Sequence, residues 1–173
     1  MKRPEFFARG GGWVLAQAIV LLLVFGLPWI AAGPRWPIPT GAVPLLRLAG
    51  GLTIAVGAFF LAAGVGALGR QLTPLPAPGE GGTLITEGIF GRVRHPMYGG
   101  ILLTGIGTAL GDPTPLRWLL TALLWTFFDR KAAVEERWLR QRFGSDRYDA
   151  YAARTGRLLP RITGHVRERH RKR

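Results

Sequence analysis

The stretch "LAGGLTIAVGAFFLAAGVGAL", residues 48 to 68, contains no charged side chain. At about 1.5 Å per residue, a helix of this length crosses the roughly 30 Å hydrocarbon core of a bilayer. Its glycines and alanines are the small residues that allow helices in lipid to approach closely. We therefore expect a membrane-spanning helix that packs tightly against a neighbour. In a second interpretation, Gly64 and Gly66 instead leave room for a ligand.

A second apolar block precedes this one at residues 13–32, "WVLAQAIVLLLVFGLPWIAA", and it is also free of charge. A cleaved signal peptide would also begin with basic residues such as Lys2, Arg3 and Arg9, but its apolar region usually covers only about 7–15 residues. We therefore expect a retained span. The prolines of the following loop, "GPRWPIPTGAVP", prevent one helix from running through both blocks. Residues 1–68 are thus predicted to form an N-terminal two-span hairpin.

Two shorter apolar blocks follow at residues 97–110 and 116–128, separated by the turn sequence "GDPTP". Each covers only about 20 Å as a helix, which is less than a bilayer core. The second block continues without a helix breaker as far as Gly144. Ionisable groups beside so short a hairpin are candidates for a functional site. Those nearest to it are Arg94, His95, Arg130, Lys131 and Glu135.

Composition limits the possible functions. The chain of 173 residues has 48% hydrophobic residues, a net charge of +13 and no cysteine, so disulfides, thiolate catalysis and cysteine–zinc sites are excluded. All of its 23 Lys and Arg residues except Arg35, Arg47 and Arg117 lie on one side of the predicted spans. Because basic loops stay in the cytoplasm, we expect an integral membrane protein, of a bacterial inner membrane, with both termini cytoplasmic.

The C-terminal end is strongly basic, "RITGHVRERHRKR". We expect residues 162–173 to form a basic tail that is attracted to anionic membrane lipids, at roughly 1 kcal/mol per basic residue. No nucleic-acid recognition motif accompanies the charge, so nucleic acid is not an expected partner. His165 and His170 are poorly spaced for two ligands on one helix face, so no metal site is expected.

The sequence "RVRHPMYGG" places cationic and titratable groups directly before an apolar helix. Pro96 suits the first position of a helix, where its missing N–H has no consequence. The remaining N–H groups of the first turn, together with Arg94 and His95, then form a site for a carboxylate or a phosphate. In the alternative interpretation, Arg92 and Arg94 only contact lipid headgroups.

A second polar group lies just beyond the last apolar block. Lys131 with Glu135, and Glu136 with Arg140, are four residues apart and would pair on a helix surface. Alternatively, the adjacent carboxylates bind a cation. An amino acid moiety would satisfy both polar groups, with its carboxylate at the helix start, residues 95–98, and its ammonium at Glu135.

Three segments together are similar to a known family: "GGTLITEGIFGRVRHPMYGG", then "FFDRKAAVEERWL", then "FGSDRYDAYAAR" followed by "LLP". They resemble the isoprenylcysteine carboxyl methyltransferase family and its phospholipid methyltransferase relatives over roughly residues 70–161. Members of that family are small integral membrane enzymes that use S-adenosylmethionine. The resemblance implies an all-α polytopic membrane protein with about four transmembrane helices. It also implies a short C-terminal helical hairpin, a cytoplasmic helical extension and a methyltransferase-like cofactor-binding region at residues 69–161.

The resemblance also implies roles for individual residues. Glu135 and His95 would be catalytic, and Lys131 and Arg94 would bind substrate. Lys131 stands where eukaryotic members carry an arginine. The positive charge is kept, but the planar guanidinium that binds a carboxylate through two hydrogen bonds is lost. The implied cofactor contacts are Thr83, Leu84, Ile85, Phe90, His95, Pro96, Met97, Tyr98, Glu135 and Glu136.

We therefore expect S-adenosylmethionine-dependent methyl transfer to a lipophilic or prenylated acceptor at the cytoplasmic membrane face, with O-methylation of a carboxylate favoured. The sulfonium already activates the methyl group, so the reaction needs no metal. One alternative is N-methylation of a phospholipid amine, in which Glu135 or His95 would accept a proton. The others are a nicotinamide-dependent reductase, similar to the longer sterol reductases, and a non-catalytic membrane scaffold.

Overall fold

The computed structural model describes residues 5–31, 34–73, 75 and 82–161. These residues are predominantly helical, and no strand is assigned within them, so the predicted all-α class is confirmed. The basic tail at residues 162–173, with its predicted attraction to lipid, lies outside the described residues. The helices are α1 (Glu5–Ala8), α2 (Gly11–Ile30), α3 (Val43–Leu68), α4 (Pro96–Gly111), α5 (Pro115–Phe143) and α6 (Ser145–Arg154).

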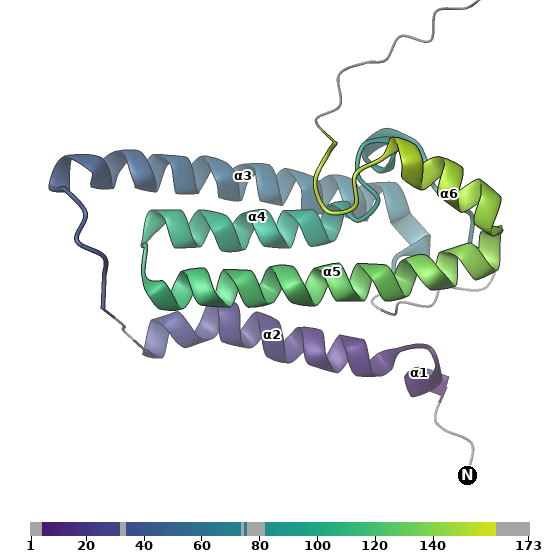
Figure 1. Cartoon of the computed structure of the whole chain (residues 1–173), viewed down its shortest axis with the longest axis horizontal. Coiled ribbons are helices and arrows are strands. Elements are labelled where there is room, and N and C mark those ends of the chain that lie inside the picture. The colour runs from purple at the N-terminus through teal and green to yellow at the C-terminus, as the bar shows by residue number, and fades with distance from the viewer. Residues whose placement is uncertain (1–4, 32–33, 74, 76–81, 162–173) are drawn as a thin grey trace, which may run out of the picture.

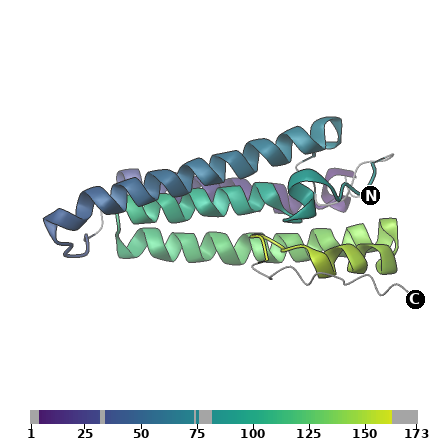
Figure 2. The ribbon, with the colours of Figure 1, turned by 90° about the horizontal axis from the view of Figure 1, so that it is seen from above.

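The four long helices lie side by side, with α4 and α5 in the middle, α3 along α4 and α2 along α5 (Figure 1). The view from above shows α3 close against α4 over most of its length (Figure 2). Helix α6 folds back over the end of α5 at the end of the bundle where α2 and α4 begin. The segments that carry the sequence motifs are therefore gathered at one end of the molecule.

Each predicted apolar block corresponds to one helix. Helix α5 continues past its apolar half and ends at Phe143, where Gly144 adopts the left-handed φ of 87° that favours glycine. The prediction that the last helix runs on as far as Gly144 is confirmed. Among the described residues, α2 and the segment around α3 are long and apolar enough to cross a membrane, whereas α4 and α5 do not pass that test.

Helices α3 and α4 pack backbone against backbone. A methyl group added at Gly57 would lie 2.6 Å from the carbonyl oxygen of Gly100, and one at Gly50 would lie 2.5 Å from that of Gly107. Because the paired glycines are seven residues apart on each helix, they form one seam along both. This favours the packing interpretation of the glycines, although Gly66 has open space beside it.

Helices α2 and α5 instead meet through side chains. Trp13 and Phe127 have ring centroids 5.7 Å apart, and Val24 of α2 is buried in the core with Leu120 and Leu124 of α5. The outer face of α2 is apolar and exposed, with Leu22 73% exposed. Such a face suits contact with lipid rather than with water.

The chain after α6 fastens the start of α4. The backbone N–H groups of Arg94 and His95 donate to the carbonyls of Gly156 and Arg157, at 2.8 Å and 3.0 Å. We call residues 155–159 the C-terminal strap. Tyr148 and Tyr151 of α6 are buried beside it.

Candidate functional site

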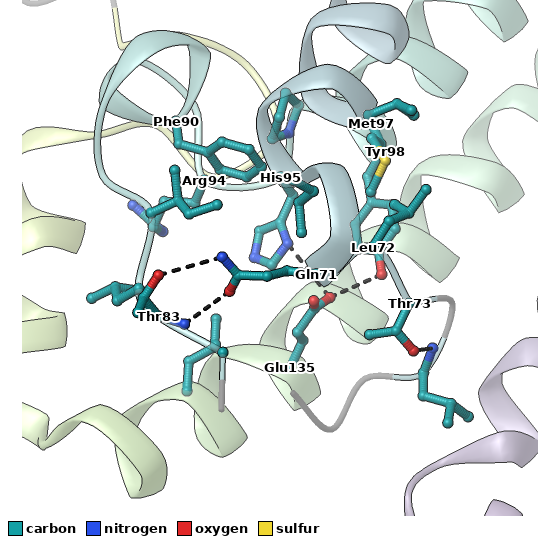
Figure 3. Close-up of a pocket in the computed structure, with 18 of the residues that line it drawn as sticks. Gln71, Leu72, Thr73, Thr83, Phe90, Arg94, His95, Met97, Tyr98 and Glu135 are labelled. Atoms are coloured by element: carbon teal, nitrogen blue, oxygen red, sulfur yellow. Dashed lines mark hydrogen bonds and ion pairs between the residues drawn. The ribbon is translucent and has the colours of Figure 1, made fainter. Parts of the chain in front are cut away.

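A cavity of about 660 Å³ opens at the end of the bundle that gathers the motifs. Its walls come from the end of α3, the first turns of α4, the second half of α5, two tyrosines of α6 and one residue of α2. The described part of residues 69–95, which we call the connector, supplies the remaining wall. Figure 3 shows these side chains converging around the start of α4. Binding sites for small molecules have volumes of roughly 300–1,000 Å³, so this cavity has the size of a cofactor site.

The first turn of α4 forms one wall. Pro96 is the first helical residue, as predicted, and the carbonyl of His95 accepts the N–H of Gly99 at 3.0 Å. The backbone N–H groups of Met97 and Tyr98 belong to the first turn, where no helical carbonyl is available to them. The wall therefore presents donors and the positive end of a helix dipole, which suits an anion.

Glu135 of α5 meets this wall. The hydroxyl of Tyr98 donates to Glu135 Oε2 at 2.9 Å, and His95 Nδ1 lies 3.6 Å from the same oxygen (Figure 3). The rings of His95 and Tyr98 stack in parallel with centroids 5.3 Å apart. Two segments that are remote in sequence thus place a carboxylate beside a helix N-terminus, at the edge of one cavity.

Glu136, the next residue, points elsewhere. Its side chain is 1% exposed and is not among those that line the cavity. Arg94 Nε donates to it at 2.8 Å and Arg157 Nη2 at 3.1 Å, while His95 Nε2 lies 3.5 Å away. We call the buried Arg94, His95 and Glu136, together with the partly exposed Arg157, the buried charge cluster. The predicted surface pairing with Arg140 is therefore not the main interaction of Glu136.

The cluster determines how Glu136 ionises. Burial by itself raises the pKa of the carboxyl, but the interactions with His95 and Arg94 outweigh it and lower the pKa to about 2. Glu136 is therefore ionised at neutral pH. It acts as the anion that holds the start of α4, the strap and α5 together, and its predicted cofactor contact stays a prediction.

Arg94 is engaged mainly with protein groups. Besides Glu136, its guanidinium donates to the backbone carbonyls of Ala152 and Thr155, at 2.9 Å and 2.5 Å. Its side chain still forms part of the cavity wall (Figure 3). These contacts hold Arg94, and with it this part of the cavity wall, in place. The predicted contact of Arg94 with substrate stays a prediction.

Lys131 lies one turn of α5 before Glu135 and is also buried. Its ammonium donates to Gln17 Oε1 of α2 and lies 5.2 Å from the centre of the Tyr98 ring. Burial lowers the pKa of Lys131, while the nearby Glu135 carboxylate raises it. The sequence reading missed Gln17, although a lone amide inside a charge-free apolar block was a signal that could have found it.

The connector forms the remaining polar wall. Gln71, another residue that the sequence reading missed, accepts the backbone N–H of Thr83 at 2.8 Å and donates to its hydroxyl at 3.4 Å (Figure 3). This exchange holds the end of α3 to the strip that precedes α4. Every cofactor contact implied by the family resemblance, apart from Glu136, lines the cavity.

The two tyrosines of α6 also reach the cavity. Burial raises the pKa of Tyr151 to about 12 and raises that of Tyr148 still further, so both phenols are protonated at neutral pH. The hydroxyl of Tyr151 donates to the carbonyl of Phe90 at 2.7 Å. That of Tyr148 is buried without a hydrogen-bond partner among the described residues, which leaves it able to bind a ligand.

A family model described as phospholipid methyltransferase matches residues 45–146, more than half of the chain. The chain belongs to this family. The predicted family is thereby confirmed, and the matched segment contains the α3–α4 seam, the connector and Glu135. Helix α2 and the strap lie outside it.

The curated proteins that are similar to this chain are named as protein-S-isoprenylcysteine O-methyltransferases. A probable one from Oryza sativa subsp. indica is 40% identical over 80 residues, which are 46% of this chain and 41% of that protein. The one from Schizosaccharomyces pombe is 36% identical over 80 residues, 46% of this chain and 34% of that protein. The matched part thus spans less than half the length of these relatives.

A solved structure of the eukaryotic intramembrane Ras methyltransferase, an isoprenylcysteine carboxyl methyltransferase, is similar in fold. The TM-score is 0.58 with 21% sequence identity, over 90% of this chain and 55% of the other. At 21% identity, this similarity establishes that the two chains share a fold.

Proposed function

We propose that the protein transfers a methyl group from S-adenosylmethionine to the carboxylate of a lipophilic, prenylated acceptor at the membrane. The observation that carries this proposal is the meeting of the α4 start with Glu135 in one cavity. A helix N-terminus and a carboxylate so arranged suit the two charges of an amino acid moiety. The names of the curated relatives supply the acceptor class.

The residues present fit this cofactor. Glu135 would hold its ammonium, and the backbone N–H groups of Met97 and Tyr98 would hold its carboxylate. The apolar side chains of Leu84, Ile85 and others line the cavity and would enclose the remainder. Bound S-adenosylmethionine supplies a methyl group that is already activated by the sulfonium.

The protein's own contribution is then orientation and the exclusion of water. Tyr98, through its hydrogen bond, fixes the Glu135 carboxylate, and the stacked His95 fixes the Tyr98 ring. A carboxylate acceptor is nucleophilic without a general base, so the residues here need only align it. Phenols that stay protonated, such as Tyr148, add donors without competing as nucleophiles.

We further propose that α2, α3, α4 and the apolar half of α5 all cross the membrane, with the cavity at the cytoplasmic end. The excess of Lys and Arg on that side supports this orientation. The acceptor's isoprenoid chain would lie along an apolar wall reached from the lipid. That wall is formed by Leu61, Val65, Leu68, Met97 and Ile101.

The test is binding followed by label transfer. Calorimetry in detergent is expected to show binding of S-adenosylhomocysteine, the demethylated product, and no binding of a nicotinamide dinucleotide. Methyl label added to membranes is expected on a prenylated carboxylate, in an ester that mild base cleaves. Base-stable label on phospholipid amines would favour N-methylation instead, and nicotinamide binding would favour a reductase.

A further inference from the structure

The outer face of α5 changes from apolar to basic along the helix. Because a helix turns by about 100° per residue, positions 119, 123, 126, 130 and 137 all fall within about 60° of one another. Leu119 and Leu123 come first and are 68% and 43% exposed. Thr126, Arg130 and Arg137 follow, and these side chains are exposed as well. The basic part of this face therefore begins where the apolar half of α5 ends.

Arg130 and Arg137 have no ion pair or side-chain hydrogen bond with any residue that the structure describes. No Asp or Glu stands three or four residues from either arginine, the spacing at which side chains pair on a helix. The carboxylates next to them in the chain, Asp129 and Glu136, are paired with Arg157 of the strap. Both guanidiniums are therefore available to an anion from outside the chain.

The depth of the two arginines follows from the length of α5. The helix begins at Pro115, so Arg130 lies about 22 Å and Arg137 about 33 Å along its axis. The hydrocarbon core of a bilayer is roughly 30 Å thick, so a helix that crosses it carries Arg130 just inside the boundary and Arg137 just beyond it. Arg130 can reach the headgroups because a long side chain extends towards the surface.

We propose that Arg130 and Arg137 bind the phosphate groups of anionic phospholipids and so anchor α5 at the surface of the bilayer. A guanidinium binds a phosphate through two parallel hydrogen bonds, so each arginine fits one headgroup. The inference rests on the proposed membrane crossing of α5 and not on methyl transfer. Because Glu135 lies between the two arginines on the same helix, the anchor also sets the depth of the cavity in the bilayer.

A fluorescent reporter on this face tests the proposal, because the chain contains no cysteine of its own. Thr126→Cys places one thiol about one turn before Arg130, and the hydroxyl that it removes bonds only to the carbonyl of Ala122 at 2.9 Å. The labelled full chain is reconstituted in bilayers of phosphatidylcholine. Quenching by spin-labelled phosphatidylglycerol or phosphatidylcholine then reports which lipid lies beside the two arginines.

The reporter is expected to prefer phosphatidylglycerol by about tenfold or more, because each basic residue near an anionic surface contributes about fivefold. Arg130→Gln combined with Arg137→Gln is expected to reduce the preference to less than about threefold. The matched control, Arg142→Gln with Arg147→Gln, removes the same charge from exposed positions at the far end of α5 and on α6. Arg142 lies about 24 Å along α5 from Thr126, beyond the screening length of about 8 Å, so the control should keep the preference.

The outcomes distinguish this inference from the proposed function. Equal quenching by the two lipids would overturn the inference, as would an unchanged preference after replacement of Arg130 and Arg137, or an equal loss in the control. A dimer that becomes a monomer after that replacement, measured by light scattering in detergent, would assign the face to a second copy of the chain instead. The lipid preference is measured without cofactor, so absence of S-adenosylhomocysteine binding would overturn only the proposed function.

Discussion

The two outer helices of the bundle are attached in opposite ways. Helix α3 meets α4 through glycines whose backbones touch, so that an added methyl at Gly57 would collide with a carbonyl. Helix α2 meets α5 through side chains, including the rings of Trp13 and Phe127 and the contact of Gln17 with Lys131. The first interface admits almost no substitution, whereas the second can be rebuilt from other side chains.

This difference coincides with the limits of the family match. The α3–α4 seam lies within residues 45–146, together with Glu135 and the start of α4. Helix α2 lies outside that segment. A rigid seam suits a part of the bundle that must keep one shape, and a side-chain interface suits a part that can differ between proteins.

The largest effect is expected at the seam. Gly57→Leu inserts a side chain where the carbonyl of Gly100 already lies, and a helix backbone cannot yield as a side chain can. We expect a loss of about 3 kcal/mol or more of stability, or failure to fold. Heating in detergent, followed by size-exclusion chromatography, measures it. Gly51→Leu on the same helix, where the glycine has open space, is the control, and equal damage in both would contradict the seam.

The next effect is expected at the buried charge cluster. Glu136→Ala leaves the guanidinium of Arg94 buried without its carboxylate, and breaking such a pair costs about 3–5 kcal/mol. Thermal unfolding in detergent measures the loss. Asp149→Ala removes the exposed carboxylate that pairs with Arg140 at 2.7 Å, and it is expected to change stability by less than about 1 kcal/mol. Similar losses in the two variants would show that the cluster does not hold the strap.

Acid should weaken the same cluster. The pKa of Glu136 is lowered from 4.5 to about 2 in the folded protein, so its contribution is complete above pH 4.5 and is lost as pH falls towards 2. By pH 3 the expected loss from this group is roughly 2 kcal/mol. Unfolding measured between pH 6 and 3 tests this, and Glu136→Gln should flatten the profile. If the stability of Glu136→Gln depends on pH as that of the native protein does, other groups cause the acid sensitivity.

A smaller effect, confined to binding, is expected at Glu135. Glu135→Gln keeps the shape and an acceptor for Tyr98 but removes the charge proposed for the cofactor ammonium. Affinity for S-adenosylhomocysteine should fall about 10- to 100-fold, the cost of one charge-assisted hydrogen bond. Calorimetry measures it, with Asp149→Asn as the control outside the cavity. If Glu135→Gln binds S-adenosylhomocysteine with the native affinity, Glu135 does not bind the cofactor.

Much of the fold follows from local properties of the sequence. The four apolar blocks, the helix start at Pro96 and the helix end before Gly144 depend on hydropathy and backbone preference, which neighbouring residues determine. The roles implied by the family motifs likewise fall on eleven of the 26 residues that line the cavity. The small residues of α3 indicated close packing, but not that α4 was its partner.

The sequence by itself thus determined the helices, their approximate ends and the residues around which a site could form. Only the tertiary structure decided what each polar side chain does. Glu135 and Glu136 are adjacent and chemically identical, yet a helix turns by about 100° per residue, so one lines the cavity while the other is buried under Arg157 of the strap. Gln17 and Lys131 belong to helices far apart in the chain. Their contact exists because α2 packs on α5, and no local pattern encodes that pairing.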